Sequence, residues 1–470
     1  MIRFLAALGA AAFVAAAPLS ADAQSTRPAL GPTKPFRVPA SETYTLPNGL
    51  QVTLIPYGLA PKVTASLRVY AGNLNEGTQT WLPDLTGDMM KEGAAGRSAE
   101  ALANAAASMG GGLNLDVTQH ETVLNLNVLS EHGADAVRLL ADVARRPDFP
   151  AGEFDRVRQN LLRNLAVARS QPGPTADWAF ARAYWGDTHP YGRIFPTEAQ
   201  LRAYTLDDVR RFHASNFGAR RARLYVAGQF DAAAVKAAIA QAYSDWAPGP
   251  ARLTLPAQVR GGPRVILVDR PGAPQSTLRI GFAAPAAGSD RDIGYRVTNA
   301  LLGGSFTSRI TKNIRESKGY TYSPFSAISQ TPGAAVWRFN ADVTTDVTGA
   351  ALSEVFKEIK GLQTTAPPAT EATGIRTWLA GTFILQNASA GGLIGSLATR
   401  DFHGLPADWL DQYVPQVMGV RDADLQSLAR EQLPLDKMLL VVVGDLSKVT
   451  PQLKALPELR GATYETMTPS

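Results

Sequence analysis

The sequence contains no cysteine among its 470 residues, and this absence removes several kinds of protein chemistry at once. Disulfide bonds, thiolate zinc sites, iron–sulfur clusters and a cysteine nucleophile are all excluded. Charge is also scarce, because charged residues make up 19% of the chain and the formal net charge is only +5. So small a surplus of positive charge is not typical of a protein that binds polyanions, and we expect no nucleic-acid partner.

The sequence also lacks an apolar run long enough to cross a membrane. The longest run covers 4–17 and has 14 residues, whereas a spanning helix needs about 20. This run follows Arg3 and precedes an A-x-A cleavage site at 21–23, a pattern typical of a signal peptide over 1–23. We therefore expect export to the bacterial periplasm, a flexible lead-in over 24–40 and no membrane span after cleavage.

What the chain does have is enough apolar material for large cores. Hydrophobic residues make up 45% of the sequence, and the 41 glycines and 32 prolines are dispersed along it. This composition is typical of a folded protein. The length exceeds the common 100 to 200 residues of one domain, so it predicts two or three domains.

Two features of the sequence occur twice at almost the same spacing. Residues 51–72 and 264–285 each have the pattern of a strand, a polar turn and a second strand, and the second begins 213 residues after the first. Residues 224–231 and 440–447 each show an apolar strand that stops at glycine before a helix, with an offset of 216. Two independent repeats at one offset indicate a duplicated domain of about 215 residues.

The repeats divide the mature chain into an N-terminal domain over 41–247, a Pro- and Gly-containing linker over 248–263 and a C-terminal domain over 264–470. Within each half, alternating strands such as 122–128 are mixed with long helices such as 153–169. The runs are unequal and show no strict βαβ repeat. We therefore predict an α+β fold of two duplicated domains, each a mostly antiparallel sheet with helices packed on one face.

Several common catalytic patterns are missing. No two histidines stand four residues apart, no G-x-S-x-G motif occurs, and no glycine-rich segment matches a phosphate-binding loop. A helix-borne zinc pair, a serine nucleophile on a tight turn and a nucleotide site are therefore not expected. Most of the histidines should be structural or lie on the surface; they are His120, His132, His189, His213 and His403.

Residues 301–327 form the most suggestive segment of the chain. Ile310 and Ile314 share one face of an expected helix, and Gly319 offers a left-handed stop at its C-terminus. The pattern over 320–326 predicts a strand that leaves this stop. The segment therefore predicts a helix and a strand that meet at one rim of the second domain.

Two polar side chains stand at this predicted junction. Arg315 belongs to the last helical turn and Tyr322 to the adjoining strand. Arg315 could simply cap its own helix while Tyr322 packs on the sheet. A guanidinium and a phenol at one rim would also make a donor pair suited to a carbonyl oxygen or an oxyanion.

Taken together, several segments resemble the insulinase/pitrilysin zinc peptidases, a family that includes the mitochondrial processing peptidase and its two-subunit bacterial relatives. The resemblance covers nearly the whole mature chain, and it implies that Arg315 and Tyr322, which match the family's pair in type and spacing, bind substrate and stabilise the tetrahedral intermediate. The segments that carry it are TLPNGLQVTL at 45–54, GGGLNLDVTQHETV at 110–123, HPYGR at 189–193, LLGGSFTSRI at 301–310 and RESKGYTYS at 315–323.

The resemblance also implies an edge strand that binds extended peptides by β-augmentation. A simple core hairpin is the alternative for this segment. The residues concerned are Asn114, Leu115, Asp116, Val117 and Thr118.

The metal site of the family is replaced in this sequence. The family uses HxxEH, in which two histidines bind zinc and the glutamate activates water, with a further glutamate ligand downstream. Here Asp84 and Asp88 take the histidine positions, Gly87 takes the base position, and Asn164 takes that of the downstream ligand. Glycine cannot accept a proton, and this set suits a hard oxygen-loving ion better than zinc. We expect no metal or other cofactor in this chain.

The resemblance explains such a half-site, because in two-subunit members one chain carries HxxEH and the other the Arg/Tyr pair. We therefore expect a metal-free subunit, inactive alone, that pairs with an HxxEH-bearing homologue containing zinc and acts on peptides. A catalytically inactive scaffold or peptide-binding protein is the alternative. A lone hydrolase with a different metal at Asp84 and Asp88 is a third, weaker hypothesis.

Overall fold

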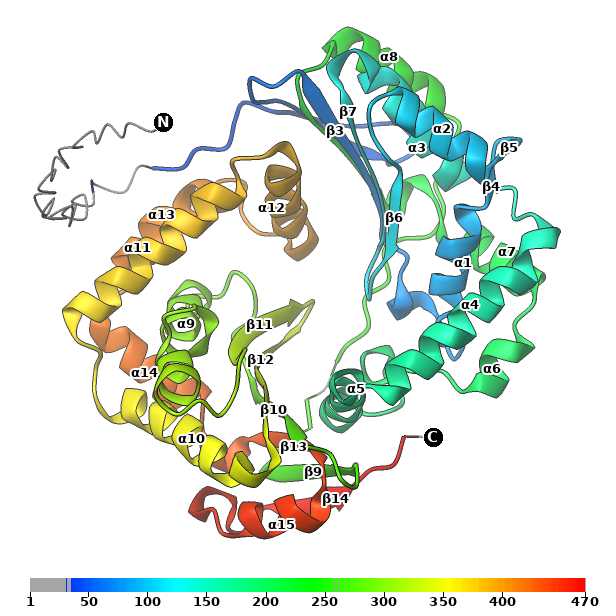
Figure 1. The fold of residues 1–470 in the computed structure, drawn as a ribbon. Coiled ribbons are helices and arrows are strands. Elements are labelled where there is room, and N and C mark those ends of the chain that lie inside the picture. Colours follow the sequence, from blue (N-terminus) through cyan, green and yellow to red (C-terminus); the bar gives the residue numbers. More distant parts are fainter. Residues whose placement is uncertain (1–30, 32–34, 258, 261, 470) are drawn as a thin grey trace, which may run out of the picture. The chain divides into compact units, whose positions relative to one another are not determined.

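The structure is a computed structural model that describes residues 31, 35–257, 259–260 and 262–469. It divides into two units, Met1–Lys34 and Pro35–Ser470, and every helix and strand described below belongs to the second (Figure 1). The signal peptide predicted for 1–23 lies outside the described residues. Within those residues, no helix is long and apolar enough to cross a membrane.

The first half is built around a six-stranded sheet with the order β1-β2-β8-β3-β7-β6. Only β2 and β8 pair in parallel; the other neighbours are antiparallel. Its strands are β1 Glu42–Thr45, β2 Gln51–Pro56, β3 Lys62–Val69, β6 Asn114–Val117, β7 Thr122–Leu129 and β8 Ala222–Gly228, and a separate two-residue hairpin is formed by β4 Gly93–Ala94 and β5 Arg97–Ser98.

The second half has a sheet of the same design, with the order β11-β12-β10-β13-β9-β14. Read from the other end, the strands β9, β13, β10, β12 and β11 follow the same path as β2, β8, β3, β7 and β6. The strands are β9 Arg264–Asp269, β10 Gln275–Ala283, β11 Phe325–Thr331, β12 Ala334–Thr344, β13 Leu439–Gly444 and β14 Thr463–Thr466. Both repeats found in the sequence are thus confirmed as equivalent strands of two related sheets.

Helices fill the connections in both halves. The first half contains α1 Leu82–Met90, α2 Ala99–Ser108, α3 Gly133–Arg145, α4 Ala151–Ser170, α5 Pro172–Trp185, α6 Glu198–Ala203, α7 Leu206–Asn216 and α8 Ala232–Tyr243. The second contains α9 Asp292–Asn299, α10 Thr348–Thr364, α11 Ala369–Gln386, α12 Ala390–His403, α13 Trp409–Gly419, α14 Asp422–Gln432 and α15 Leu446–Lys454. Two π-helical segments, η5 Ala300–Gly304 and η6 Thr311–Ser317, follow α9. Short 3₁₀ turns are η1 Asn73–Asn75, η2 Ser130–His132, η3 Pro190–Gly192, η4 Ala219–Arg221, η7 Thr345–Val347, η8 Leu435–Lys437 and η9 Pro457–Leu459.

Local sequence explains where many of these helices begin. The strand β8 stops at Gly228, and Asp231 then caps α8, because its Oδ1 accepts hydrogen bonds from the Ala233 and Ala234 N–H groups. The equivalent Asp445 caps α15 through the Ser447 N–H group. Side-chain oxygens at this position satisfy N–H groups that have no partner within the helix.

Each half contributes one helix that packs on the sheet of the other half, an arrangement that we call the helix exchange. Helix α5 of the first half packs on β9, β10 and β13 of the second sheet, where Phe180 and Tyr184 are buried against Val441 and Val443. Helix α12 of the second half packs on β8 and β3 of the first sheet (Figure 1). The predicted α+β fold is confirmed, and the structure adds that the second face of each sheet receives a helix from the other half.

The prediction of a strand over 320–326 is wrong about where the strand begins. Gly319 does end the helical segment with φ +64, and the Tyr320 N–H group donates to the Ile314 carbonyl at 2.8 Å. Thr321 then makes only an isolated bridge to Val343, and β11 begins at Phe325. Pro324 explains the delay, because proline has no N–H group to donate to a sheet.

Candidate functional site

The residues at the replaced metal-site positions meet in one cavity of the first half. Helix α1 contributes Asp84, Gly87 and Asp88, and α4 contributes Asn164. Leu115, Asp116 and Val117 of the edge strand β6 line the same cavity, whose volume is about 300 Å³. The structure therefore brings together residues that lie 80 positions apart in the sequence (164 − 84).

The carboxylates in this cavity are engaged by polar neighbours. The Asn73 Nδ2 atom donates to Asp84 Oδ2 at 3.0 Å, and Lys91 Nζ lies 2.8 Å from Asp88 Oδ1. Burial raises the pKa of Asp84 to about 6, although the Asn73 hydrogen bond opposes this shift. Asp84 therefore takes up a proton at a higher pH than an ordinary aspartate.

Side chains of the edge strand β6 occupy the space beside Gly87, the position at which the family has its general base. A Cβ atom added at Gly87 would lie 2.5 Å from Val117 Cγ2 and 3.0 Å from Leu115 Cδ2. These distances are too short for unstrained carbon contacts, so a glutamate fits at position 87 only if the side chains of Val117 and Leu115 are displaced. The close approach of β6 to α1 therefore depends on the absence of a side chain at Gly87.

This donor set does not fit a catalytic zinc ion. Zinc in peptidases of this type is bound by histidine nitrogen together with a carboxylate, and a neighbouring glutamate activates the water. The four replaced positions offer two carboxylates, Asp84 and Asp88, one amide, Asn164, and no base at Gly87. Across 31, 35–257, 259–260 and 262–469, no cluster of three or more His, Cys, Asp or Glu side chains could hold a metal ion.

The edge strand is one residue shorter than predicted. Strand β6 covers Asn114–Val117 and lies at the end of the first sheet. Thr118 follows β6. Its carbonyl accepts a hydrogen bond from the Asn73 N–H group at 3.1 Å, and its N–H group donates to the Glu121 carbonyl at 2.8 Å. One side of β6 therefore remains unpaired over four residues among the described strands.

The second candidate location is the surface around Arg315. Arg315 lies on η6, and its Cζ atom is 5.1 Å from the centre of the Tyr322 ring. The same Cζ atom lies 4.5 Å from the ring centre of a second aromatic neighbour, Phe306. Tyr322 is 81% exposed and Phe306 is 64% exposed, so this cation–π cluster faces solvent.

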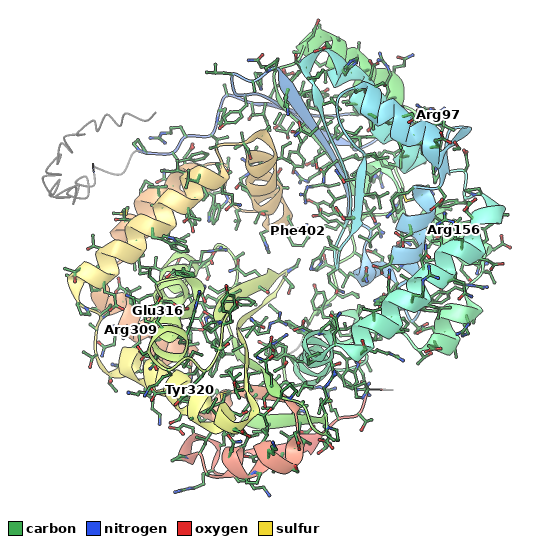
Figure 2. The ribbon with its side chains drawn as sticks, in the orientation of Figure 1. Arg97, Arg156, Arg309, Glu316, Tyr320 and Phe402 are labelled. Atoms are coloured by element: carbon green, nitrogen blue, oxygen red, sulfur yellow. The ribbon has the colours of Figure 1, made fainter. Side chains whose placement is uncertain are left out.

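The segment that carries Arg315 is held firmly, whereas Arg315 itself is not paired. Ile310 and Ile314 are fully buried. Arg309, labelled in Figure 2, donates from Nε and Nη2 to the two carboxylate oxygens of Glu371 at 2.9 and 2.7 Å. Within the described part of the chain, the Arg315 guanidinium makes no ion pair or side-chain hydrogen bond, so its donors are free to bind a ligand.

Phe306 was missed by the sequence reasoning. It stands between the glycine pair of LLGGSFTSRI and the helix and is 64% exposed. Such a residue beside a predicted donor pair is the signal that could have identified it. The π-helical geometry of η6 is a further indication, since π-helical turns occur frequently at functional sites.

The histidines take structural positions. His189 Nδ1 accepts from the Tyr191 N–H group at 3.1 Å at the start of η3, and His213 Nε2 lies 2.9 Å from the Ala144 carbonyl. His120 packs its ring against Phe402, with 4.9 Å between ring centres. Burial lowers the pKa of His120 to about 4.

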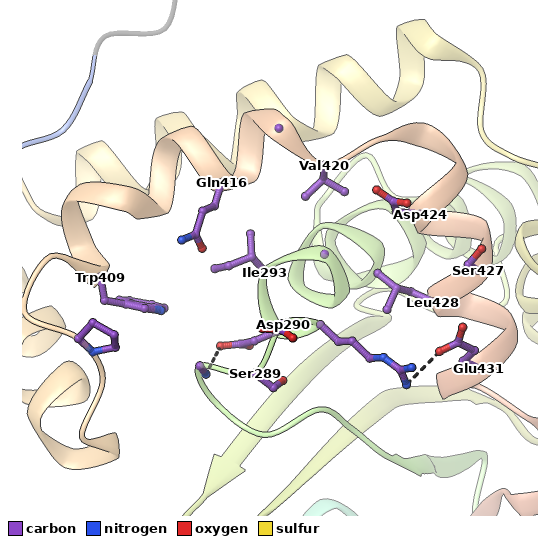
Figure 3. Close-up of a pocket in the computed structure, with 16 residues that line it drawn as sticks. Ser289, Asp290, Ile293, Trp409, Gln416, Val420, Asp424, Ser427, Leu428 and Glu431 are labelled. Carbon is purple, nitrogen blue, oxygen red and sulfur yellow. Dashed lines mark hydrogen bonds and ion pairs between the residues drawn. The ribbon is translucent and has the colours of Figure 1, made fainter.

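A separate cavity of about 730 Å³ lies between α9 and the helices α13 and α14 (Figure 3). Arg291 and Glu431 form an ion pair of 3.0 Å at its wall. Residues predicted from the sequence to form a site do not line this cavity.

Family models match both halves of the chain. "Insulinase (Peptidase family M16)" matches residues 53–189, and "Peptidase M16 inactive domain" matches residues 203–377. The chain therefore belongs to the insulinase family of peptidases, family M16, and the resemblance inferred from its motifs is confirmed.

Relatives and solved structures agree with this assignment. An uncharacterized zinc protease of Mycobacterium tuberculosis is 27% identical over 307 residues, which cover 64% of this chain and 70% of the relative. A peptidase M16 inactive domain from Pseudomonas fluorescens has a TM-score of 0.78 at 22% identity and covers 86% of this chain and 98% of its own. A protease from Helicobacter pylori has a TM-score of 0.80 at 18% identity, with 87% and 100% covered. These two structures share the fold.

Proposed function

We propose that this chain is the non-catalytic subunit of a heterodimeric zinc endopeptidase, and that its partner is a homologous subunit carrying HxxEH. The observation that carries the proposal is the free Arg315 guanidinium beside the exposed Tyr322 phenol, in a chain whose own metal-site positions lack a base. On this proposal the chain is inactive alone and binds no catalytic metal. Its predicted signal peptide assigns the complex to the bacterial periplasm.

The roles of the two residues follow from their chemistry. Attack of water on the scissile carbonyl carbon places negative charge on the carbonyl oxygen. Arg315 and Tyr322 donate hydrogen bonds to that oxygen, while the zinc and the general base come from the partner subunit. Donors fixed before the reaction stabilise the developing charge without having to reorganise, and the loss of one such donor costs about 10² to 10³ in kcat.

The unpaired side of β6 supplies a place for an extended substrate. A peptide that pairs with Asn114–Val117 would gain main-chain hydrogen bonds without a fixed side-chain sequence. This mode suits peptides and unfolded segments of proteins. It also explains why a subunit without a metal site can still contribute to substrate binding.

The test is peptide hydrolysis in the presence of zinc by material co-purified on a C-terminal tag of this chain from its native host. Arg315→Ala and Tyr322→Phe should each lower activity at least tenfold while an HxxEH-bearing partner still co-purifies. Arg291→Ala, which removes an exposed ion pair with Glu431, is the matched control and should leave activity unchanged.

Two results would change the assignment. Activity that is unaffected by both substitutions would remove Arg315 and Tyr322 from the reaction. A partner that co-purifies without hydrolysing any peptide of a broad panel would assign the chain to the scaffold or peptide-binding class. Metal analysis of the purified chain addresses the remaining alternative, because a stoichiometric ion that is lost in Asp84→Ala would indicate a metal site of its own.

A further inference from the structure

A polar groove lies on the face of the first sheet that α12 only partly covers. It is bounded by the β2–β3 turn, by β3 and β7, and by the N-terminus of α12, and its volume is about 640 Å³. We call this the inner-face groove. Its floor consists of Lys62, Thr64, Ser66, Arg68, Asn125 and Asn127.

The alternation along β3 produces this floor. Val63, Ala65, Leu67 and Val69 are fully buried in the core of the first half, and successive side chains of a strand point to opposite faces. The residues between them therefore point into the groove. On the neighbouring strand β7, Asn127 pairs with Thr64 and Asn125 pairs with Ser66. The polar residues thus form two adjacent rows.

The floor of the inner-face groove offers hydrogen-bonding groups that have no protein partner. Ser66 is 1% exposed, and its Oγ atom has no hydrogen-bond partner. The side chains of Lys62, Thr64, Asn125 and Asn127 also make no hydrogen bond or ion pair to any described residue. Ser66 is the buried member of this set, and a buried hydroxyl without a partner favours a ligand that hydrogen-bonds to it, whereas Lys62 and Asn127 are exposed at the edge of the groove.

The equivalent face of the second sheet has no such row. Thr64 of β3 pairs with Ala227, the residue before the glycine that ends β8, and Thr277 of β10 pairs with Val443, the residue before the glycine that ends β13. Thr64 and Thr277 are therefore equivalent. Two residues further along each strand, Ser66 corresponds to Arg279. Thr277 Oγ1 donates to Asp342 at 2.6 Å, and Arg279 Nε donates to Asp177 of α5 at 2.9 Å. The unsatisfied row is therefore specific to the first sheet and does not follow from the duplicated fold.

The charge of the inner-face groove indicates the ligand. Lys62 is unpaired among the described residues, and Arg68 shares its charge with Glu121. The N-cap residue Ser389 and Gly391 of the first turn of α12 line the groove, and the partial positive charge of a helix N-terminus favours anions. Aspartate and glutamate are absent from its lining residues. The groove therefore combines positive charge with neutral donors.

We propose that the inner-face groove binds a carboxylate group of a peptide, either the C-terminal carboxylate or an acidic side chain. Lys62 supplies the opposing charge, and the Ser66 hydroxyl, the two asparagine amides and the first turn of α12 supply hydrogen bonds. The proposal rests on the proposed function only in taking the ligand to be a peptide. It assigns to this chain a preference for peptides with a free carboxylate at a fixed place along the bound segment.

The experiment is fluorescence anisotropy with the purified chain alone, without any partner subunit. Four labelled octapeptides serve as probes: a neutral peptide with a free C-terminus, its C-terminal amide, and the amide with either Glu or Gln at the centre. We expect the free acid, the Glu peptide or both to bind at least fivefold more tightly than the matched neutral form. Whichever pair shows the difference identifies the source of the carboxylate.

Two variants locate the binding. Lys62→Met should abolish the preference, whereas Lys357→Met, an exposed lysine on α10, should retain it. Ser66→Ala should weaken binding of the preferred peptide while leaving the melting temperature unchanged or higher, because it removes a buried hydroxyl without a partner. A merely structural role for Ser66 would not separate these two readouts.

Three results would overturn the proposal: no measurable peptide binding, equal affinity for charged and neutral forms, or a preference that survives Lys62→Met. The measurement involves neither hydrolysis nor a partner. Its failure is therefore distinguishable from failure of the Arg315 and Tyr322 test.

Discussion

Glu76 is a buried carboxylate next to the replaced metal-site positions. Its side chain is fully buried, and Oε2 accepts a hydrogen bond from the Trp81 N–H group at 3.1 Å. Arg193 Nε lies 3.6 Å from Oε1. Burial raises the pKa of Glu76 to about 7, and the charge of Asp84 adds to this shift, although the Trp81 hydrogen bond and Arg193 oppose it. The folded protein therefore retains a proton here that the unfolded chain releases near pH 4.5.

This shift makes stability depend on pH in a defined direction. Between about pH 4.5 and 7 the Glu76 carboxyl binds more protons in the folded state than in the unfolded state, so its contribution to the free energy of unfolding decreases as pH rises through this window. The total change from Glu76 is at most about 3 kcal/mol. Glu76→Gln should flatten the curve between pH 6 and 7.5, where Asp84, whose pKa is about 6, contributes less.

Urea denaturation at a series of pH values measures this effect. The buried histidines, such as His120, act in the opposite direction, so the quantity to compare is the stability of the wild type minus that of Glu76→Gln, which should decrease as pH rises from 6 to 7.5. Asp207→Asn, at an exposed carboxylate on α7, is the control and should keep the wild-type slope. A difference between wild type and Glu76→Gln that stays constant or increases over this interval would contradict the raised pKa of Glu76.

At the scale of elements, the contact between α1 and β6 explains why the first half cannot regain a base by one substitution. Gly87→Glu should destabilise the fold by about 1–3 kcal/mol, because the new side chain must displace Val117. Gly152→Glu on α4 is the matched control. A Cβ atom there meets nothing within 4 Å, so this change should be neutral or slightly stabilising.

Thermal and urea unfolding of the two glycine variants test this prediction. Val117→Ala combined with Gly87→Glu should recover part of the lost stability, because it removes the valine methyl group that a Cβ atom at position 87 would meet first. Equal stability of the Gly87→Glu and Gly152→Glu chains would show that β6 moves aside at no cost.

The elements also show how far the sequence could predict the structure. Both repeats, the edge strand and the meeting of Asp84 with Asn164 follow from local patterns and from the family resemblance. Phe306 and the first residue of β11 did not follow. The start of β11 depends on Pro324 interrupting the pairing with β12, a competition that hydrophobic alternation does not report.

At the scale of the whole chain, the exchange of α5 and α12 could not be predicted from sequence. The apolar residues of the two helices show that each has a buried face, but periodicity does not indicate which sheet covers that face. The exchange is reinforced where α12 ends: Tyr225 Oη donates to Asp401 at 2.8 Å. The Arg252 guanidinium, from the linker, lies 4.4 Å from the Tyr70 ring centre and 4.1 Å from the ring centre of Phe402. Figure 2 labels Phe402 at the end of α12.

This exchange predicts that the two halves depend on each other for folding. Separated from the second sheet, α5 would expose Phe180 and Tyr184, each only 2% exposed in the whole chain. Each lost aromatic contact costs roughly 2–3 kcal/mol, and marginal stability leaves little reserve. Chains 24–256 and 257–470 expressed separately should therefore be insoluble or lack a cooperative melt, whereas co-expression should restore one complex.

Size-exclusion chromatography and thermal melting of the three preparations distinguish the possibilities. A full-length chain cut once within 248–263 after folding is the control, and it should elute and melt much like the intact chain, because the exchanged helices keep their contacts. If either half alone were monomeric with a sharp melt near that of the intact chain, the exchanged helix would be dispensable. Interdependent halves would hold Arg315 and the inner-face groove in one folding unit, so that a change which unfolds either half removes both surfaces together.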